Sequence, residues 1–245
     1  MKKKLLFPHP LVEGLIKSRP NRFIMEVELD GALYKCHCPS TGRIGSIRFE
    51  DIPCLLSQAS TPRKTPYTVE AISLDPPGAR RKSWTGINQT RANDYVAFFL
   101  REGAFSEMLP GVETISREVK LGDSRIDFLV NGRDYLEVKM PLKDIPCERH
   151  PQYKGRNDAP VDFTRMIKHF TDVGNSIANG SRAIFLLCYI YDALPFEVPP
   201  PDIRAERIVG AARKAEAMGV EHWQANFAIG PEGVSLIRYF RLRLF

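Results

Sequence analysis

Two acidic residues and a lysine have the types and spacing that metal-assisted chemistry requires. Asp127 lies in the segment 124–130, and Glu137 and Lys139 follow ten and twelve residues later. Both segments are typical of strands, and an Asn-Gly turn signal separates them. Carboxylates on neighbouring strands can hold Mg2+ or Mn2+, and a lysine on the same face can orient water or stabilise charge on a phosphate. We therefore predict Asp127, Glu137 and Lys139 as a catalytic set, with Asp127 and Glu137 as metal ligands.

The length of the connecting turn decides whether the two acids meet. Directly opposed residues of an antiparallel pair face the same way. A two-residue turn at 131–132 would set Asp127 opposite Leu136 and place the carboxylates on opposite faces. A three-residue loop at 131–133 would set Asp127 opposite Glu137. The site therefore requires an odd-length loop or a bulge, and without one the two acids are ordinary surface charges balanced by neighbouring cations.

Composition bounds the class of protein. The 245 residues allow one large or two small domains, and 43% apolar residues are enough for a substantial core. Five scattered cysteines argue against a disulfide framework and for a reducing compartment. The apolar run at the N-terminus is broken too early to be a signal peptide, and no segment could span a bilayer. We expect a cytoplasmic protein.

The positive charge is concentrated in the first third of the chain. Residues 1–85 hold 14 Lys and Arg against 8 Asp and Glu, which accounts for the whole net charge of +6. A basic module joined to a neutral one indicates that the first binds a polyanion such as nucleic acid. The alternative is that the basic surface only aids solubility.

Short strands dominate this first third. They are expected at 22–29, 32–38, 43–49 and 67–74. The one segment of this part in which a helix is considered is 50–58. Such a pattern favours a small β-barrel. A segment rich in Pro and Gly at 75–82 marks the junction, so we divide the chain into domains at 1–85 and 86–245.

The second part alternates helices and strands. Helices are expected at 90–103, 161–179 and 202–218, and strands at 112–120, 124–130, 135–140 and 183–190, with two more closing the chain. The apolar run at 183–190 is typical of a strand covered on both faces. This order predicts an α/β domain with a mixed sheet. The segment 141–160 has little periodicity, and since it follows Lys139 it could form one wall of the site.

Cations and one aromatic residue of the basic module are candidate nucleic-acid contacts. OB-fold proteins combine a basic groove with aromatic platforms on which bases stack. For most aromatic residues, core packing is the better interpretation. Loop placement favours Trp84 and the cluster that precedes it. The full predicted set is Arg22, Arg43, Arg63, Lys64, Arg80, Arg81, Lys82 and Trp84.

Several short elements in order resemble the sugar fermentation stimulation protein (SfsA) family. They are Arg22-Phe23, the Cys-Pro-Ser-Thr-Gly run at 38–42, Ala92-Asn93, Glu118-Val119-Lys120, the two strand motifs around Asp127 and Glu137, and an Arg-x-x-Lys-His pattern at 165–169. Each element is weak alone, but their order over most of the chain is specific. Two positions depart from the family pattern: Phe98 stands where an acid is frequent, and Ile167 stands where a glutamine is frequent.

The resemblance implies an OB-fold followed by a domain like the PD-(D/E)xK nucleases. It also implies DNA binding and a role in regulating sugar use, notably of maltose. Possible accessory members of the site are Glu118, Arg165, Lys168 and His169, together with Glu102, which lies one turn after Phe98 and could replace the missing acid.

Two functions remain open from the sequence. The first is a metal-dependent nuclease whose OB domain binds nucleic acid, with DNA as the expected target. The second is a DNA-binding regulatory protein that keeps the nuclease scaffold without cleavage. A sugar-converting enzyme is a third class, for which no motif is present.

Overall fold

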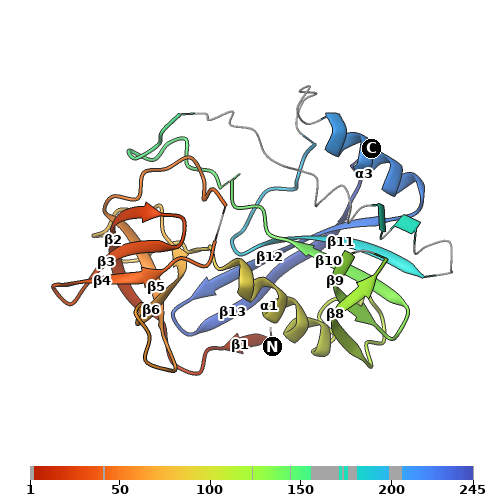
Figure 1. Ribbon diagram of the computed structural model, residues 1–245, viewed down its shortest axis with the longest axis horizontal. Helices are drawn as coiled ribbons and strands as arrows, with labels where there is room; N and C mark the ends of the chain where they lie inside the picture. The colour runs from red at the N-terminus through yellow and green to blue at the C-terminus, as the bar shows by residue number, and fades with distance from the viewer. Residues whose placement is uncertain are drawn as a thin grey trace.

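Two sheets form the molecule, a small barrel and a larger open sheet (Figure 1). The computed structural model describes residues 3–40, 42–122, 124–143, 145–155, 171–172, 174–175, 181–198 and 206–244. No helix among these residues is long and apolar enough to cross a membrane. Most of the predicted helix at 161–179 lies outside the described residues.

The barrel is built from five consecutive strands. They are β2 (Val12–Asn21), β3 (Ile24–Leu29), β4 (Ala32–His37), β5 (Ile52–Gln58) and β6 (Tyr67–Ile72). The sheet runs β4-β3-β2-β5-β6, and a parallel pairing of β4 with β6 closes it. This is the Greek-key order of an OB-fold, as expected. Residues 30–31, which lie between two of the predicted strands, form the turn from β3 to β4, with positive φ angles of 51° at Asp30 and 77° at Gly31.

Two predictions for the barrel were wrong, and one strand was not predicted. The segment 52–58 is a strand instead of a helix, because Ile52–Leu56 are buried on both faces and pair with β2 and β6. The segment 43–49 forms only an isolated bridge between Ile47 and Tyr153. Strand β2 was missed, since Gly14 and Pro20 and two register shifts interrupt its alternation.

The larger sheet is mixed, as predicted. Its order is β1 (Lys4–Leu6), β13 (Gly233–Leu242), β12 (Glu221–Gly230), β11 (Arg182–Tyr189), β10 (Asp134–Lys139), β9 (Ser124–Val130) and β8 (Ile115–Leu121). The pairs β10–β11 and β11–β12 are parallel, and the others are antiparallel. Strand β11 lies in the middle and is mostly buried. The division at residue 85 needs one correction: β1 belongs to this sheet, because it pairs with β13 and forms the edge of the sheet.

The two described helices cover opposite faces of this sheet (Figure 1). Helix α1 (Gln89–Arg101) buries Tyr95, Val96, Phe99 and Leu100 and ends before Gly103, which has a positive φ of 66°. Helix α3 (Glu206–Ala217) packs Ala212 and Ala215 against Ile126 and Phe185 in a separate small cluster.

The barrel and the sheet share one apolar core. The cluster that holds barrel residues such as Ile52 and Val69 also holds Phe99 of α1 and Phe227 of β12. A short strand, β7 (Thr85–Gly86), joins the two parts by pairing with β6, and Gly86 N donates to Ile190 O at 2.9 Å. A side chain at position 86 would place its Cβ 2.4 Å from Ile190 Cγ2, so the close approach requires glycine.

Candidate carboxylate site and basic pocket

The loop between β9 and β10 has the odd length that the site requires. Val130 pairs with Asp134 and Phe128 with Leu136, so residues 131–133 form the loop. Continuing this register by one residue sets Asp127 opposite Glu137, as predicted. Asn131 and Gly132 have positive φ angles of 52° and 64°, and Arg133 is the extra residue.

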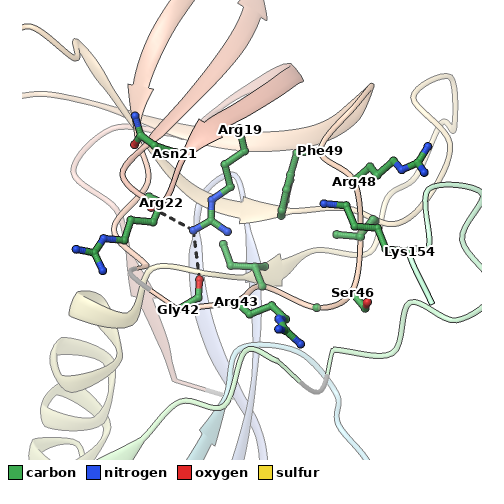
Figure 2. Close-up of a pocket in the computed structure, with 12 residues that line it drawn as sticks. Arg19, Asn21, Arg22, Gly42, Arg43, Ser46, Arg48, Phe49 and Lys154 are labelled. Carbon is green, nitrogen blue, oxygen red and sulfur yellow. Dashed lines mark hydrogen bonds between the residues drawn. The ribbon is translucent and has the colours of Figure 1, made fainter. Parts of the chain in front are cut away.

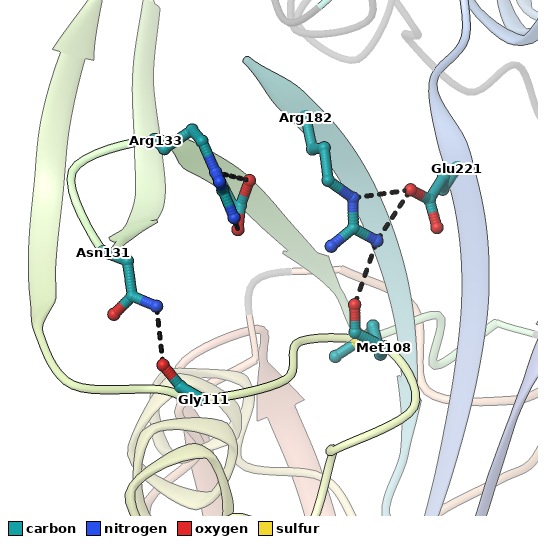
Figure 3. A network of polar contacts seen from close by, with 7 residues as sticks. Met108, Gly111, Asn131, Arg133, Arg182 and Glu221 are labelled. Carbon is teal, nitrogen blue, oxygen red and sulfur yellow. Dashed lines mark hydrogen bonds and ion pairs between the residues drawn. The ribbon is translucent and has the colours of Figure 1, made fainter. Parts of the chain in front are cut away.

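The Asn131 side chain fixes this loop against the chain that precedes β8. Its Oδ1 accepts from Glu113 N at 2.8 Å and Thr114 N at 3.1 Å. Its Nδ2 donates to Gly111 O at 2.8 Å (Figure 3). The same view shows Arg182 bound to Glu221 and to the carbonyl of Met108, which ties β11 and β12 to the chain after α1.

Where the regular pairing of β9 and β10 ends, the two carboxylates accept hydrogen bonds from backbone N–H groups in place of the carbonyls of the partner strand. Regular pairing ends at Phe128 and Leu136. Beyond it, Val138 N donates to Asp127 Oδ2 at 2.8 Å, and Asp127 N donates to Glu137 Oε2 at 3.3 Å. The Lys139 ammonium donates to Glu137 Oε1, so the lysine and the glutamate do share a face. Two carboxylates and one ammonium therefore meet at the end of a strand pair.

Helix α1 supplies a fourth member of the site. Asn93 Nδ2 donates to Asp127 Oδ1 at 2.8 Å. The helix is anchored at its start, because the N-cap Asn88 accepts from Thr90 N and donates to the buried Glu70 of the barrel at 2.7 Å. Gln89 donates to the carbonyl of Met140, the residue after Lys139, at 3.0 Å. Asn93 was named only as part of a family element, and no spacing rule pointed to a role beside Asp127.

The electrostatics of this site suit a divalent cation. Burial and the nearby Glu137 charge raise the pKa of Asp127, although hydrogen bonds from Val138 and Asn93 and the charge of Lys139 oppose the shift. Glu137 is almost fully buried, whereas the Lys139 side chain is 28% exposed. No group of three or more His, Cys, Asp or Glu that could hold a metal occurs among the described residues. Two carboxylates are nevertheless enough for Mg2+, which commonly keeps waters and takes further oxygens from phosphates.

The predicted accessory acids do not join the pair. Glu102 lies at the C-terminal end of α1, nine residues and about 13 Å along the helix from Asn93. It forms an ion pair with Lys3 at 3.2 Å. Its location therefore does not support the idea that Glu102 replaces the acid that the family frequently has at the position of Phe98. Glu118 is exposed and faces Arg125 at 4.0 Å. Arg165, Lys168 and His169 lie outside the described residues.

Two of the predicted nucleic-acid contacts are engaged elsewhere. The Lys82 side chain is 8% exposed and pairs with Glu13 at 2.9 Å, so it is not available to a phosphate. Trp84 is partly buried and packs against the core, which corrects the prediction that its loop would present it. Arg80, Arg81, Arg63 and Lys64 are exposed. Arg63 also bonds Thr65 O at 2.6 Å within its own loop.

A basic pocket of about 480 Å3 lies between the barrel and the segment 141–155 (Figure 2). Its lining includes five cations and no acidic residue among the described side chains. Arg22 and Arg43 were predicted contacts, but the other three cations were not. Their sequence signal was weak, because they are brought together from distant segments. The five are Arg19, Arg22, Arg43, Arg48 and Lys154.

The Arg19 guanidinium is fixed in the middle of this basic pocket. It donates to the carbonyls of Arg22, Ser40 and Gly42 at 3.1, 2.9 and 3.3 Å, and it lies 5.6 Å from the centre of the Phe49 ring. In Figure 2, Arg48 and Lys154 lie on one side of this pair and Arg22 on the other. Arg22, Arg43, Arg48 and Lys154 are exposed and form the rim.

Comparisons with known proteins cover both parts of the chain. The family model described as "SfsA N-terminal OB domain" matches residues 18–87, and the model described as "Sugar fermentation stimulation protein RE domain" matches residues 90–233. A sugar fermentation stimulation protein homolog of Methylorubrum populi is 33% identical over 234 residues, which cover 94% of this chain and 92% of that protein. A homolog from a Synechococcus species is 34% identical over 235 residues, covering 93% and 91%.

The same fold is found in a solved structure. The structure of Pyrococcus furiosus SfsA in complex with Ca2+ matches with a TM-score of 0.76 at 18% identity, covering 100% of this chain and 99% of that one. At this identity the match shows the fold alone. The two family models together span most of the chain, and the relatives match nearly their whole length. The chain therefore belongs to the sugar fermentation stimulation protein (SfsA) family.

Proposed function

We propose that this protein is a metal-dependent phosphodiesterase that acts on nucleic acid, with DNA as its target. The observation that carries the proposal is the convergence of Asp127, Glu137 and Lys139 where β9 and β10 part. Placing two carboxylates side by side costs stability unless a cation compensates them. One lysine offsets only one of the two charges, so the pair is suited to Mg2+ or Mn2+.

Each side chain then has a role in hydrolysis of a phosphodiester. Asp127 and Glu137 would hold the metal ion, which supplies charge neutralisation at the phosphate and lowers the pKa of water. Asn93 and the backbone N–H of Val138 keep the Asp127 carboxylate oriented. Lys139 would position the attacking water and stabilise the charge on the phosphate. The water oxygen bonds to phosphorus, the bond to the leaving oxygen breaks, and solvent takes the water proton and protonates the leaving oxygen.

The barrel provides a means of holding the strand. OB-folds bind oligonucleotides through the loop between their first two strands and the loop between their last two. In this chain, Arg22 lies in the first of these loops and Arg63 and Lys64 lie in the second. The Ca2+ complex of the Pyrococcus furiosus protein supports a divalent cation on this fold.

A DNA-binding regulator without cleavage is the second candidate. It is favoured by the small number of acids, since the described residues bring only two carboxylates together. The name of the relatives connects the family with sugar use, so a regulatory role in sugar metabolism, including that of maltose, is compatible with binding alone.

Replacement of Glu137 separates the two candidates. We expect Glu137→Gln to lower the rate of cleavage of labelled DNA in Mg2+ or Mn2+ by about a hundredfold or more. Binding of the same DNA should be unchanged. Single-stranded, duplex and branched DNA and RNA are incubated with each metal and resolved on denaturing gels. Binding is measured separately in EDTA.

Glu113→Gln is the matched control, because Glu113 is an exposed acid outside the site. It should cleave like the wild type. If the wild type retards DNA but leaves every substrate intact in both metals, the catalytic proposal fails and the regulator stands. Equal cleavage by Glu137→Gln and the wild type would point to a contaminating nuclease.

A further inference from the structure

We propose that the basic pocket binds a phosphate monoester, supplied by the terminal phosphate of a nucleic-acid strand. The inference rests on the proposed nucleic-acid binding but does not require that the strand be cut. It would make this protein a recogniser of strand ends.

The charge of the pocket exceeds what a backbone phosphate needs. A phosphodiester carries one negative charge, whereas a phosphate monoester carries about 1.5 to 2 and presents three free oxygens. Five cations line the basic pocket, and none of its described lining residues is acidic. Arginine and lysine around a concave site can reach such a group from several sides.

The centre of the pocket offers a fixed cation and an aromatic ring to the end of a strand. The fixed Arg19 guanidinium and the Phe49 ring lie at its centre, and Lys154 enters from the segment that follows the carboxylate site (Figure 2). The Phe49 ring offers an apolar surface on which a terminal base could stack. Arg22 and Arg48 are exposed at the rim on either side of this centre.

The pocket also lies close to the carboxylate site along the chain. Gly45, one of its lining residues, donates from its N–H to Leu142 O at 2.8 Å. Leu142 is three residues after Lys139, and three residues span at most about 11 Å. A strand whose end occupies the basic pocket would therefore reach Lys139 within a few nucleotides, at about 3.4 Å or more each.

Binding of end-labelled oligonucleotides tests the inference. Fluorescence anisotropy in EDTA compares one short single strand carrying a 5′-phosphate, a 3′-phosphate or hydroxyls at both ends. We expect one phosphorylated form to bind about tenfold more tightly than the hydroxyl form. Arg48→Gln/Lys154→Gln should remove that preference, because both side chains belong to the pocket rim.

Lys120→Gln/Lys214→Gln is the matched control, since it removes the same charge from exposed positions outside the pocket lining. It should keep the preference. The replaced side chains are exposed, and thermal midpoints check that both variants fold. The single variant Lys154→Gln gives a milder second measurement.

Small phosphates distinguish the two sources of a monoester. If inorganic phosphate or a nucleoside monophosphate raises the thermal midpoint of the wild type but not of Arg48→Gln/Lys154→Gln, the pocket binds monoesters. If small phosphates bind in this way but the three oligonucleotides bind with equal affinity, the ligand is a free small molecule and the strand-end assignment is wrong. Equal weakening of all three oligonucleotides, with no effect of small phosphates, would overturn the inference. All binding is measured without metal, so these outcomes do not depend on whether the protein cleaves nucleic acid. Failure of the proposed nuclease activity is therefore distinguishable from failure of the proposed phosphate binding.

Discussion

The carboxylate of Asp127 is held in a place that is unfavourable for its charge. It is partly buried beside Glu137, and both effects raise its pKa. Its oxygens are nevertheless used by Asn93 and by the backbone of Val138. A fold that keeps two acids together at this cost gains stability when a cation binds there.

Metal ions should therefore stabilise the protein in a pH-dependent way. We expect Mg2+ or Mn2+ to raise the thermal midpoint near neutral pH by a few degrees, as ligands specific to the folded state do. The increase should shrink as pH falls through the raised pKa of Asp127, because the protonated acid is a poor ligand. Differential scanning fluorimetry across pH checks this, and Asp127→Asn should show little increase at any pH.

The metal-free protein should show the opposite trend. A raised folded pKa means that the folded state binds the proton more tightly than the unfolded state, where the pKa is near the ordinary 3.8. The Asp127 contribution to stability should therefore grow as pH falls from above the folded pKa toward 3.8. Unfolding in EDTA, compared with Asp127→Asn at each pH, isolates this contribution from other titrations. A difference that is flat with pH would contradict the shift.

At the level of elements, one loop sets the register of the site. Residues 131–133 have odd length, and a one-residue change would move every following side chain of β10 to the other face. Asn131 stabilises the loop both by adopting a positive φ and by bonding to the chain at 111–114.

Asn131→Ala should consequently destabilise the protein. We expect a loss of about 4 kcal/mol, of which about 1 kcal/mol comes from the strained φ and about 1 kcal/mol from each of the three side-chain hydrogen bonds. Asn131→Gly removes the same hydrogen bonds without the strain, so it should cost about 1 kcal/mol less. Urea unfolding of both variants measures the difference. Equal losses would mean that the backbone conformation contributes nothing.

The elements show which predictions a sequence can support. The opposition of Asp127 and Glu137 was a conditional prediction: period-two alternation showed that an odd-length loop was required, but the sequence left loops of two and three residues open. The helix expected around 50–58 was wrong, since a run such as Ile52–Leu56 that is buried on both faces has no alternation to distinguish strand from helix. The basic pocket could not be foreseen, because Arg19 and Lys154 meet only through tertiary contacts.

At the level of the whole molecule, Gly86 is a point of close approach between the barrel and the chain that follows β11. The added Cβ of an alanine would lie 2.4 Å from Ile190 Cγ2 and 2.5 Å from Ile190 Cβ. The backbone hydrogen bond from Gly86 to Ile190 also spans this contact. The shared core therefore depends on a residue without a side chain at this point.

Gly86→Ala should destabilise the whole protein in one transition. We expect a loss of about 2 kcal/mol or more, because the clash involves atoms close to the backbone of Ile190 that cannot rotate away. Gly78→Ala is the matched control, since nothing lies within 4 Å of its added Cβ. Unfolding followed by circular dichroism and tryptophan fluorescence measures both variants. Separate transitions for the two sheets would contradict the shared core.

The pairing of β1 with β13 has a consequence for how the protein is made. Lys4–Leu6 leave the ribosome first among the paired strands, but their partner, Gly233–Ser235, is synthesised more than 220 residues later. The barrel strands are contiguous between Val12 and Ile72, so they can assemble while translation continues. Strand β1 therefore has no partner strand at the time when the barrel can already be folded. Completion of the larger sheet is thus a late event that joins the beginning of the described chain to its end.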